Sequence, residues 1–176
     1  MGIFDFFKRN KKPELNTKSR HFDDDGNLEG IGTYVNGKKE GLWKYFEETE
    51  DGKLYLNLKQ TYSKGLREGL STEYHENGKI FMEVYYKNDV GNGIKREYNE
   101  NGILLESGFY VNGKENGEWK FYDNKGNLKI VVPFKYGEIS DPKIKNIIME
   151  ESKKYEGLFQ LFGTSYTFII RQMLKT

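Results

Sequence analysis

The 176-residue chain contains no cysteine, and this absence excludes several kinds of chemistry. Disulfide frameworks, thiolate nucleophiles and Cys-based zinc sites all require it. Histidine is nearly as scarce: His21 and His75 are its only two occurrences. His75 lies beside turn residues with no Ser or second His at a catalytic spacing, so we expect it in an exposed loop. We therefore predict a protein that is not an enzyme and that holds no metal ion and no cofactor.

The chain also lacks an excess of charge of one sign and a long apolar run. Its 28 basic and 27 acidic side chains leave a net charge of +1, whereas proteins that coat nucleic acid usually carry a strong basic excess. No stretch of about 18 apolar residues could span a membrane. The apolar start, residues 1–7, precedes its lysines, which reverses the order of a secretory signal. These features predict a soluble, cytoplasmic protein that does not bind nucleic acid.

Glycine and tyrosine are abundant and unevenly placed. Seventeen of the 20 Gly lie in residues 21–140, which carry a net charge of −5. Residues 1–20 carry +4 and residues 141–176 carry +2. We therefore divide the chain into a basic N-terminal segment (1–20), a Gly-rich array (21–140) and a C-terminal segment (141–176).

The array is a repeat with a period of about 24 residues. One Gly series is spaced 28, 24 and 24 residues apart, with a Tyr seven residues before each Gly and an aromatic five residues after it. The repeat-defining residues are Tyr34, Gly41, Tyr62, Gly69, Tyr86, Gly93, Tyr110 and Gly117, and the later aromatics are Phe46, Tyr74, Tyr98 and Tyr122.

Each unit reads as a β-hairpin, because apolar and polar residues alternate and Asn-Gly pairs interrupt them. We expect the repeated glycines to mark turns, and Tyr residues one period apart to become neighbours in an aromatic column. The predicted fold is mainly β, a single-layer antiparallel sheet of about nine strands made from stacked hairpins. After Asp141 and Pro142, apolar residues at helical spacing predict two C-terminal helices, the second one beginning after Ser165.

The segments "YVNGKKEGLWKYF" (34–46) and "YVNGKENGEWKFY" (110–122) resemble the MORN repeat, in the bacterial variant found in YwqK-family antitoxins. The resemblance covers about residues 26–137. It implies stacked β-hairpins and a binding or scaffolding role. The middle units depart from the pattern, with Ser71 and Lys95 at the Trp position.

The end units differ from the middle ones on one face of the predicted sheet. The end units carry Trp43, Tyr45, Trp119 and Phe121, whereas the middle units carry Ser71, Glu73, Lys95 and Glu97 at the same positions. One interpretation is that the N-terminal "GIFDFF" and the C-terminal helices cover the end units. The other is that these four aromatics anchor a partner. In either case the middle is wet or forms a polar recognition strip.

Both ends of the chain leave alternatives open. Residues 3–12 combine apolar and basic side chains and could pack, be disordered or touch an anionic membrane surface. The apolar faces of the C-terminal helices could cover the sheet or bind a partner. The acidic insertion "EETED" (47–51) reads as a solvated hairpin tip or as a loop for a basic partner.

From these observations we predict a non-catalytic module that binds another protein. The resemblance implies an antitoxin or immunity-type protein that acts by occluding a toxin. A cell-wall or carbohydrate-binding repeat protein and a membrane-surface scaffold are the two alternatives.

Overall fold

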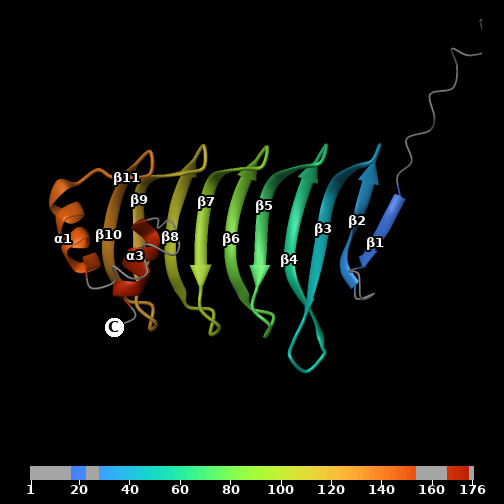
Figure 1. The fold of residues 1–176 in the computed structure, drawn as a ribbon, viewed down its shortest axis with the longest axis horizontal. Coiled ribbons are helices and arrows are strands. Elements are labelled where there is room, and N and C mark those ends of the chain that lie inside the picture. The colour runs from blue at the N-terminus through green and yellow to red at the C-terminus, as the bar shows by residue number, and fades with distance from the viewer. Residues whose placement is uncertain (1–16, 23–27, 154–165, 175–176) are drawn as a thin grey trace, which may run out of the picture.

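The computed structural model describes residues 17–22, 28–153 and 166–174, which form one open sheet and two helices (Figure 1). The strands are β1 (Thr17–Phe22), β2 (Leu28–Val35), β3 (Lys38–Glu48), β4 (Leu54–Ser63), β5 (Leu66–Tyr74), β6 (Ile80–Lys87), β7 (Val90–Tyr98), β8 (Leu104–Val111), β9 (Lys114–Tyr122), β10 (Leu128–Lys135) and β11 (Glu138–Ile139). The helices are α1 (Pro142–Ser152) and α3 (Tyr166–Met173).

The strands follow one another across the sheet in chain order, and each pairs antiparallel with the next. This meander confirms the predicted stack of hairpins in a single layer. The described part of the chain has 11 strands rather than about nine. One of the additional strands is the short β11, which forms the C-terminal edge of the sheet. At the other edge β1 spans the predicted boundary at residue 20, so the sheet begins earlier than the sequence indicated.

Two kinds of turn join the strands. At one edge Asn36 and Gly37, and Asn112 and Gly113, both have positive φ angles, as in a type I′ hairpin turn. At the opposite edge, longer loops carry a single Gly at positive φ: Gly52, Gly78, Gly102 and Gly126. The predicted acidic insertion belongs to this second edge, where the β3–β4 hairpin extends beyond its neighbours as an exposed tip (Figure 1).

The repeat-defining glycines do not lie in turns, and this part of the prediction is wrong. Gly41, Gly69, Gly93 and Gly117 fall inside strands β3, β5, β7 and β9, all with positive φ. The register shifts beside them, between Ile31 and Thr33 for example, because each bulge sets extra residues against the partner strand. A Gly accepts this conformation without the steric cost that a Cβ would add.

Alternation along the strands gives the sheet two different faces. We call the side that bears Trp43, Ser71, Lys95 and Trp119 the helix face, because α1 and α3 pack on it at its C-terminal end. The opposite side, which bears Leu42, Leu70 and Ile94, is the open face. The two aromatic series of the repeat therefore separate: the Tyr34 series lies on the helix face and the Phe46 series on the open face.

The predicted aromatic column is interrupted. One sequence period spans two strands, so a different strand lies between successive Tyr residues of the series. Lys39 of β3 has its Nζ 5.2 Å from the Tyr62 ring centroid, and the Arg67 guanidinium of β5 lies 4.1 Å from the Tyr86 ring centroid. A cation therefore lies beside the rings in the first two intervals of the series, which favours cation–π contacts over Tyr–Tyr stacking there, whereas β7 places Gly91 between Tyr86 and Tyr110.

The two described helices cover the last strands, which is the first of the two alternatives that the sequence left open. Asp141 caps α1, since its carboxylate accepts from the backbone N–H groups of Lys143 (2.8 Å) and Ile144 (3.1 Å). Ile148 of α1 and Ile169 and Ile170 of α3 are buried against Trp119, Phe121, Val132, Phe134 and Ile139. Ile147, which the helical spacing placed on the apolar stripe, is 60% exposed. Neither helix of the described segments is long and apolar enough to cross a bilayer.

Some predictions fall outside the described residues. These are the placement of the apolar start and of the membrane-contact segment 3–12, and the apolar positions of the first predicted C-terminal helix beyond residue 153.

Candidate binding groove on the helix face

The central row of the helix face runs across the sheet from one tryptophan to the other. Cross-strand partners share a face, and the register joins Trp43 to Gln60, Gln60 to Ser71, Ser71 to Val84 and Val84 to Lys95. Lys95 is in turn opposite Gly108, and Trp119 lies on the next strand. The predicted polar middle between aromatic ends is therefore one continuous row.

Trp43 closes the N-terminal end of this row. Its ring lies flat over Gly32 of β2, where an added Cβ would sit 2.0 Å from the ring. Tyr34 contacts the ring edge-on, with centroids 5.0 Å apart, and the Lys39 ammonium lies 4.6 Å from the ring centroid. The indole N–H donates to the Thr33 carbonyl oxygen at 3.3 Å. Trp43 is consequently fully buried.

Trp119 closes the C-terminal end in the same way. An added Cβ on Gly108 would sit 2.1 Å from its ring, and its N–H donates to the Phe109 carbonyl oxygen at 3.3 Å. Tyr110 again contacts the ring edge-on, at 5.1 Å between centroids. Here the two helices add a further layer, and Phe121 on the same strand is also fully buried.

The four predicted anchor residues thus have little surface to offer a partner. Trp43, Trp119 and Phe121 are fully buried, and Tyr45 is half-buried with its hydroxyl donating to the Tyr62 hydroxyl at 3.0 Å. Their direct contact with a partner remains a prediction. In the described structure these residues pack at the two ends of the central row.

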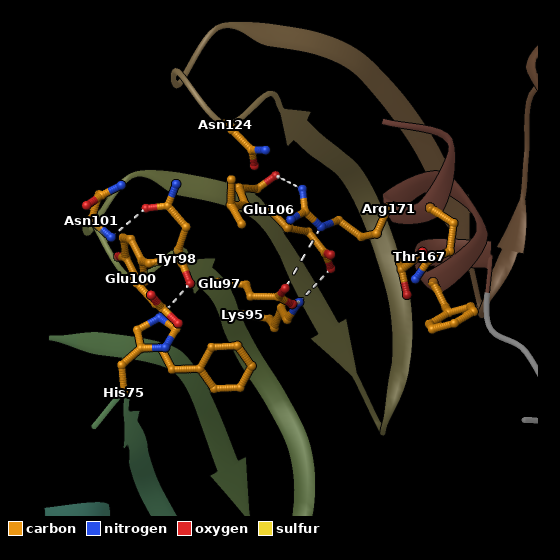
Figure 2. Close-up of a pocket in the computed structure, with 15 residues that line it drawn as sticks. His75, Lys95, Glu97, Tyr98, Glu100, Asn101, Glu106, Asn124, Thr167 and Arg171 are labelled. Carbon is orange, nitrogen blue, oxygen red and sulfur yellow. Dashed lines mark hydrogen bonds and ion pairs between the residues drawn. The ribbon is translucent and has the colours of Figure 1, made fainter. Parts of the chain in front are cut away.

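Between the two tryptophans the row consists of the buried residues Gln60, Ser71, Val84 and Lys95, and cavities adjoin it. Three adjoining cavities lie here, and the largest of the three, about 730 Å³, lies between the sheet and α3 (Figure 2). A second cavity, of about 660 Å³, shares His75, Phe81 and Glu100 with the first, and a third, of about 490 Å³, shares Lys95. We call these three adjoining cavities the groove.

A charged cluster forms the floor of the largest cavity. The buried Lys95 ammonium donates to Glu97 and to Glu106, at 2.7 Å each. Burial raises the pKa of the Glu106 carboxyl above its usual value, and the nearby Lys95 charge opposes this rise. The carboxylate of Glu106 is thus stabilised mainly by Lys95, and to a smaller extent by Arg171, against the cost of its burial.

Arg171 of α3 also contacts this charged cluster (Figure 2). Its guanidinium donates to the backbone carbonyl oxygens of Leu105 (3.2 Å) and Tyr122 (3.4 Å) and lies 3.9 Å from a Glu97 carboxylate oxygen. These acceptors belong to strands β7, β8 and β9. One side chain therefore links α3 to three strands at the side of the largest cavity.

The second cavity is acidic. Four glutamates line it, Glu47, Glu73, Glu76 and Glu100, and its described lining contains no Lys or Arg. Burial raises the pKa of Glu73, and the charge of Glu47 adds to this rise. This part of the groove disfavours anionic ligands such as nucleic acid.

His75 lies where the first two cavities meet, and it is half-buried rather than in an exposed loop as predicted. Its Nε2 is 3.1 Å from the Tyr98 carbonyl oxygen, and its ring contacts Phe81 edge-on at 5.1 Å. These two contacts fix the imidazole between neighbouring hairpins. Among the residues described, no three His, Asp or Glu side chains converge in a way that would hold a metal ion.

The sequence-based reasoning missed several groove residues. Gly32 and Gly108 each precede a tryptophan by 11 residues, and this spacing was a readable signal for the flat packing of the indole rings. Gln60 and Glu106 become visible only once the strand register is known. Arg171 carries no signal, since its partners are backbone carbonyls far away in the sequence.

Comparison with known protein families gives one match. The model of the MORN repeat variant matches residues 15–36, 67–88, 92–112 and 115–136. The last three segments correspond to successive hairpins, β5–β6, β7–β8 and β9–β10. The unmatched segment, residues 37–66, contains the two longest strands, β3 and β4. A comparison with curated proteins gives no match.

Proposed function

Because this chain is a MORN-repeat protein, we propose that it is a non-catalytic module that binds another protein through the groove on the helix face. One observation carries the proposal: three adjoining cavities with polar and charged linings lie on the helix face, beside the row that joins the two buried tryptophans. The two tryptophans lie six strands apart, on β3 and β9, which corresponds to about 29 Å at the usual inter-strand spacing. A segment of polypeptide fits these dimensions better than a small molecule does.

The polarity of the groove supports a protein partner. Its floor offers carboxylates, an ammonium group, a guanidinium and an imidazole, and these groups fix orientation in protein interfaces through hydrogen bonds. The acidic second cavity favours a partner segment with basic side chains and disfavours phosphate-rich ligands.

The finer proposal is an antitoxin or immunity-type role. In this mechanism the helix face covers the working surface of a toxin and excludes its substrate. The proposal rests on the sequence resemblance together with the groove. It requires no chemistry from the chain, only a stable complementary surface.

Charge reversal at the rim of the groove tests the binding. Glu76 and Glu100 are exposed and line the second cavity, so Glu76→Lys with Glu100→Lys should preserve the fold and repel a basic partner. We expect the amount of partner recovered with the tagged chain from its native cells to fall at least about tenfold. Glu48→Lys with Glu50→Lys, at the exposed hairpin tip, makes the same change in net charge and should leave recovery unchanged.

Two outcomes separate the general proposal from the finer one. If the groove variant retains every partner, binding through the groove is wrong. If the partner is lost as expected but does not arrest growth when expressed alone, the antitoxin role is wrong and the binding role stands. Alanine at Trp43 or Trp119 is a poorer probe, since it would open a cavity in the core.

A further inference from the structure

The open face carries an exposed apolar stripe that no described element covers. Five side chains on β3, β5, β6, β7 and β8 form it: Leu42 (53% exposed), Leu70 (44%), Tyr85 (43%), Ile94 (39%) and Phe109 (48%). Leu70 is directly opposite Tyr85, and Ile94 is directly opposite Phe109. On β4 the polar Thr61 lies opposite Leu42, so the stripe is continuous from β5 to β8 and resumes at β3. Exposed apolar patches on a protein surface often mark a surface that binds a partner.

A row of basic side chains lies beside this stripe. In the strand register, the row next to the stripe contains Arg20, Ile31, Lys44, Lys59, Thr72, Glu83, Arg96, Ser107 and Lys120. We call its five bases the basic ladder. Glu83 is the single acid in the row, and its carboxylate already accepts from Arg96 (3.5 Å) and from the Tyr98 hydroxyl (3.2 Å).

The basic ladder is not arranged for the stability of the sheet. Lys44 and Lys59 are directly opposite each other, and like charges in that position are destabilising. Lys59 turns its ammonium over the Tyr74 ring, 5.0 Å from the centroid. Within the described residues, Lys44 and Lys120 are exposed and have no ion pair. An anionic partner would relieve this repulsion.

We propose that the open face docks an acidic amphipathic helix of a partner protein, with its apolar side on the stripe and its carboxylates on the basic ladder. The spacing fits, since strands repeat every 4.8 Å or so and a helix presents one apolar side chain per turn of about 5.4 Å. Five strand spacings from β3 to β8 give about 24 Å, the length of roughly 16 helical residues.

Charge and location favour an acidic helix of a partner protein over the chain's own helices, a second copy of the chain or a membrane surface. α1 and α3 pack on the other face, so they do not compete for the stripe. A second copy would bring its own basic ladder to the interface. A flat anionic headgroup layer would also meet Glu83 and the exposed Glu118, which stands on the same face beyond Phe109. A partner helix can place its carboxylates opposite the bases alone.

The test uses the full chain and a dye-labelled peptide of about 18 residues, with Leu on one side of its helix and Glu along one flank. Fluorescence anisotropy should show that it binds at least about tenfold more tightly than a peptide with Lys in place of each Glu, and more weakly at high salt. Lys44→Glu with Lys120→Glu should weaken binding at least about tenfold. Lys79→Glu with Lys125→Glu, at exposed turns, should leave it unchanged.

Several results would overturn the proposal. One is equal binding of the two peptides, and another is unchanged binding by the ladder variant. Phosphatidylserine vesicles that bind in place of the peptide, with the same loss in the ladder variant, would make this face a membrane surface. A dimer that Ile94→Thr with Phe109→Thr dissociates in sedimentation would identify a second copy as the occupant. None of these outcomes bears on the groove, which lies on the opposite face.

Discussion

The two tryptophan side chains of the protein lie where two glycines leave room for them. Gly32 and Gly108 provide flat floors for the rings of Trp43 and Trp119, and the middle strands place Gln60 and Val84 at the corresponding positions. A tryptophan on one strand therefore requires a glycine on the strand before it. The middle units lack both members of this pair and carry smaller or polar buried side chains at these positions.

Gly108→Ala should destabilise the protein by about 1–3 kcal/mol, the usual cost of overpacking a tight core. The new Cβ would lie 2.1 Å from the Trp119 ring, which the helices prevent from moving away. Urea unfolding at neutral pH measures the change.

Gly91→Ala is the matched control, because Gly91, like Gly108, lies within a strand and on the helix face. Its Cβ would meet only the Tyr110 side chain, at an ordinary 3.6 Å, so we expect a change below about 0.5 kcal/mol. Equal losses in the two variants would show that strand flexibility, rather than ring packing, explains the glycine.

The Lys95 and Glu106 pair makes a second prediction at this scale. Lys95→Met removes the cation that supports a carboxylate with 2% side-chain exposure, and should cost about 3–5 kcal/mol at neutral pH. Lys95→Met with Glu106→Leu should recover most of this loss, because the deeply buried carboxylate is removed with its cation and the remaining Glu97 keeps Arg171 3.9 Å away.

The pH dependence of the Lys95→Met variant follows from the same carboxyl group. Burial already raises the Glu106 pKa above its usual 4.5, and loss of Lys95 raises it further. A carboxyl with a raised folded-state pKa takes up its proton preferentially in the native protein. The variant should therefore regain stability relative to wild type as the pH falls from 8 toward 4.5. A constant difference across this range would contradict the assignment.

At the scale of elements, the loops at one edge of the sheet share one architecture with different residues. In the β7–β8 loop, the Asn99 side-chain oxygen accepts from the backbone N–H groups of Asn101 and Ile103, both at 3.0 Å. In the β9–β10 loop, Asp123 accepts from those of Lys125 and Asn127, both at 2.9 Å. The repeat conserves the loop geometry while the capping side chain varies between a neutral and a charged one.

This difference predicts how the β9–β10 loop responds to acid. Hydrogen bonds from the Asn127 side chain and backbone lower the Asp123 pKa from 3.8 to about 2. A lowered pKa stabilises the fold above the unfolded-state value and loses this effect as the pH falls through the folded-state value. The stability of wild type over Asp123→Ala should therefore shrink from about pH 5 to pH 2.5.

Asp123→Asn separates charge from geometry. Asn99 shows that an amide can accept the same pair of bonds, so the loop should form and its stability over Asp123→Ala should stay constant with pH. A pH-dependent advantage in this variant would mean that another group titrates in the loop.

At the scale of the whole molecule, periodicity predicted the architecture but not its register. Glycine spacing and alternation were sufficient for a single-layer stack of hairpins, and the contrast between Trp43 and Ser71 correctly placed a polar middle between aromatic ends. The same periodicity misplaced the Tyr column, because one repeat spans two strands and Lys39 and Arg67 lie between the rings. The bulges at Gly41 and its equivalents were missed, since a positive φ suits a turn and a bulge equally.

Long-range contacts account for the rest of what the sequence did not reveal. The basic ladder gathers side chains from five strands, and Arg171 reaches backbone atoms of two strands that lie far from it in the sequence. Neither arrangement leaves a local pattern. The near-neutral net charge conceals both an acidic cavity on one face and a basic row on the other.

Because the two buried tryptophans lie at the ends of the middle units, the number of these units determines the length of the groove. The groove spans the middle units and reaches into the flanking ones, where Glu47 and Asn124 line it, so its length increases with the number of middle units. Duplicating one 24-residue middle unit would lengthen the groove by two strand spacings, about 10 Å, and leave both tryptophans in place. Deleting one would shorten it equally. Under the proposed function, the number of repeats would set the size of the partner segment that the groove accepts.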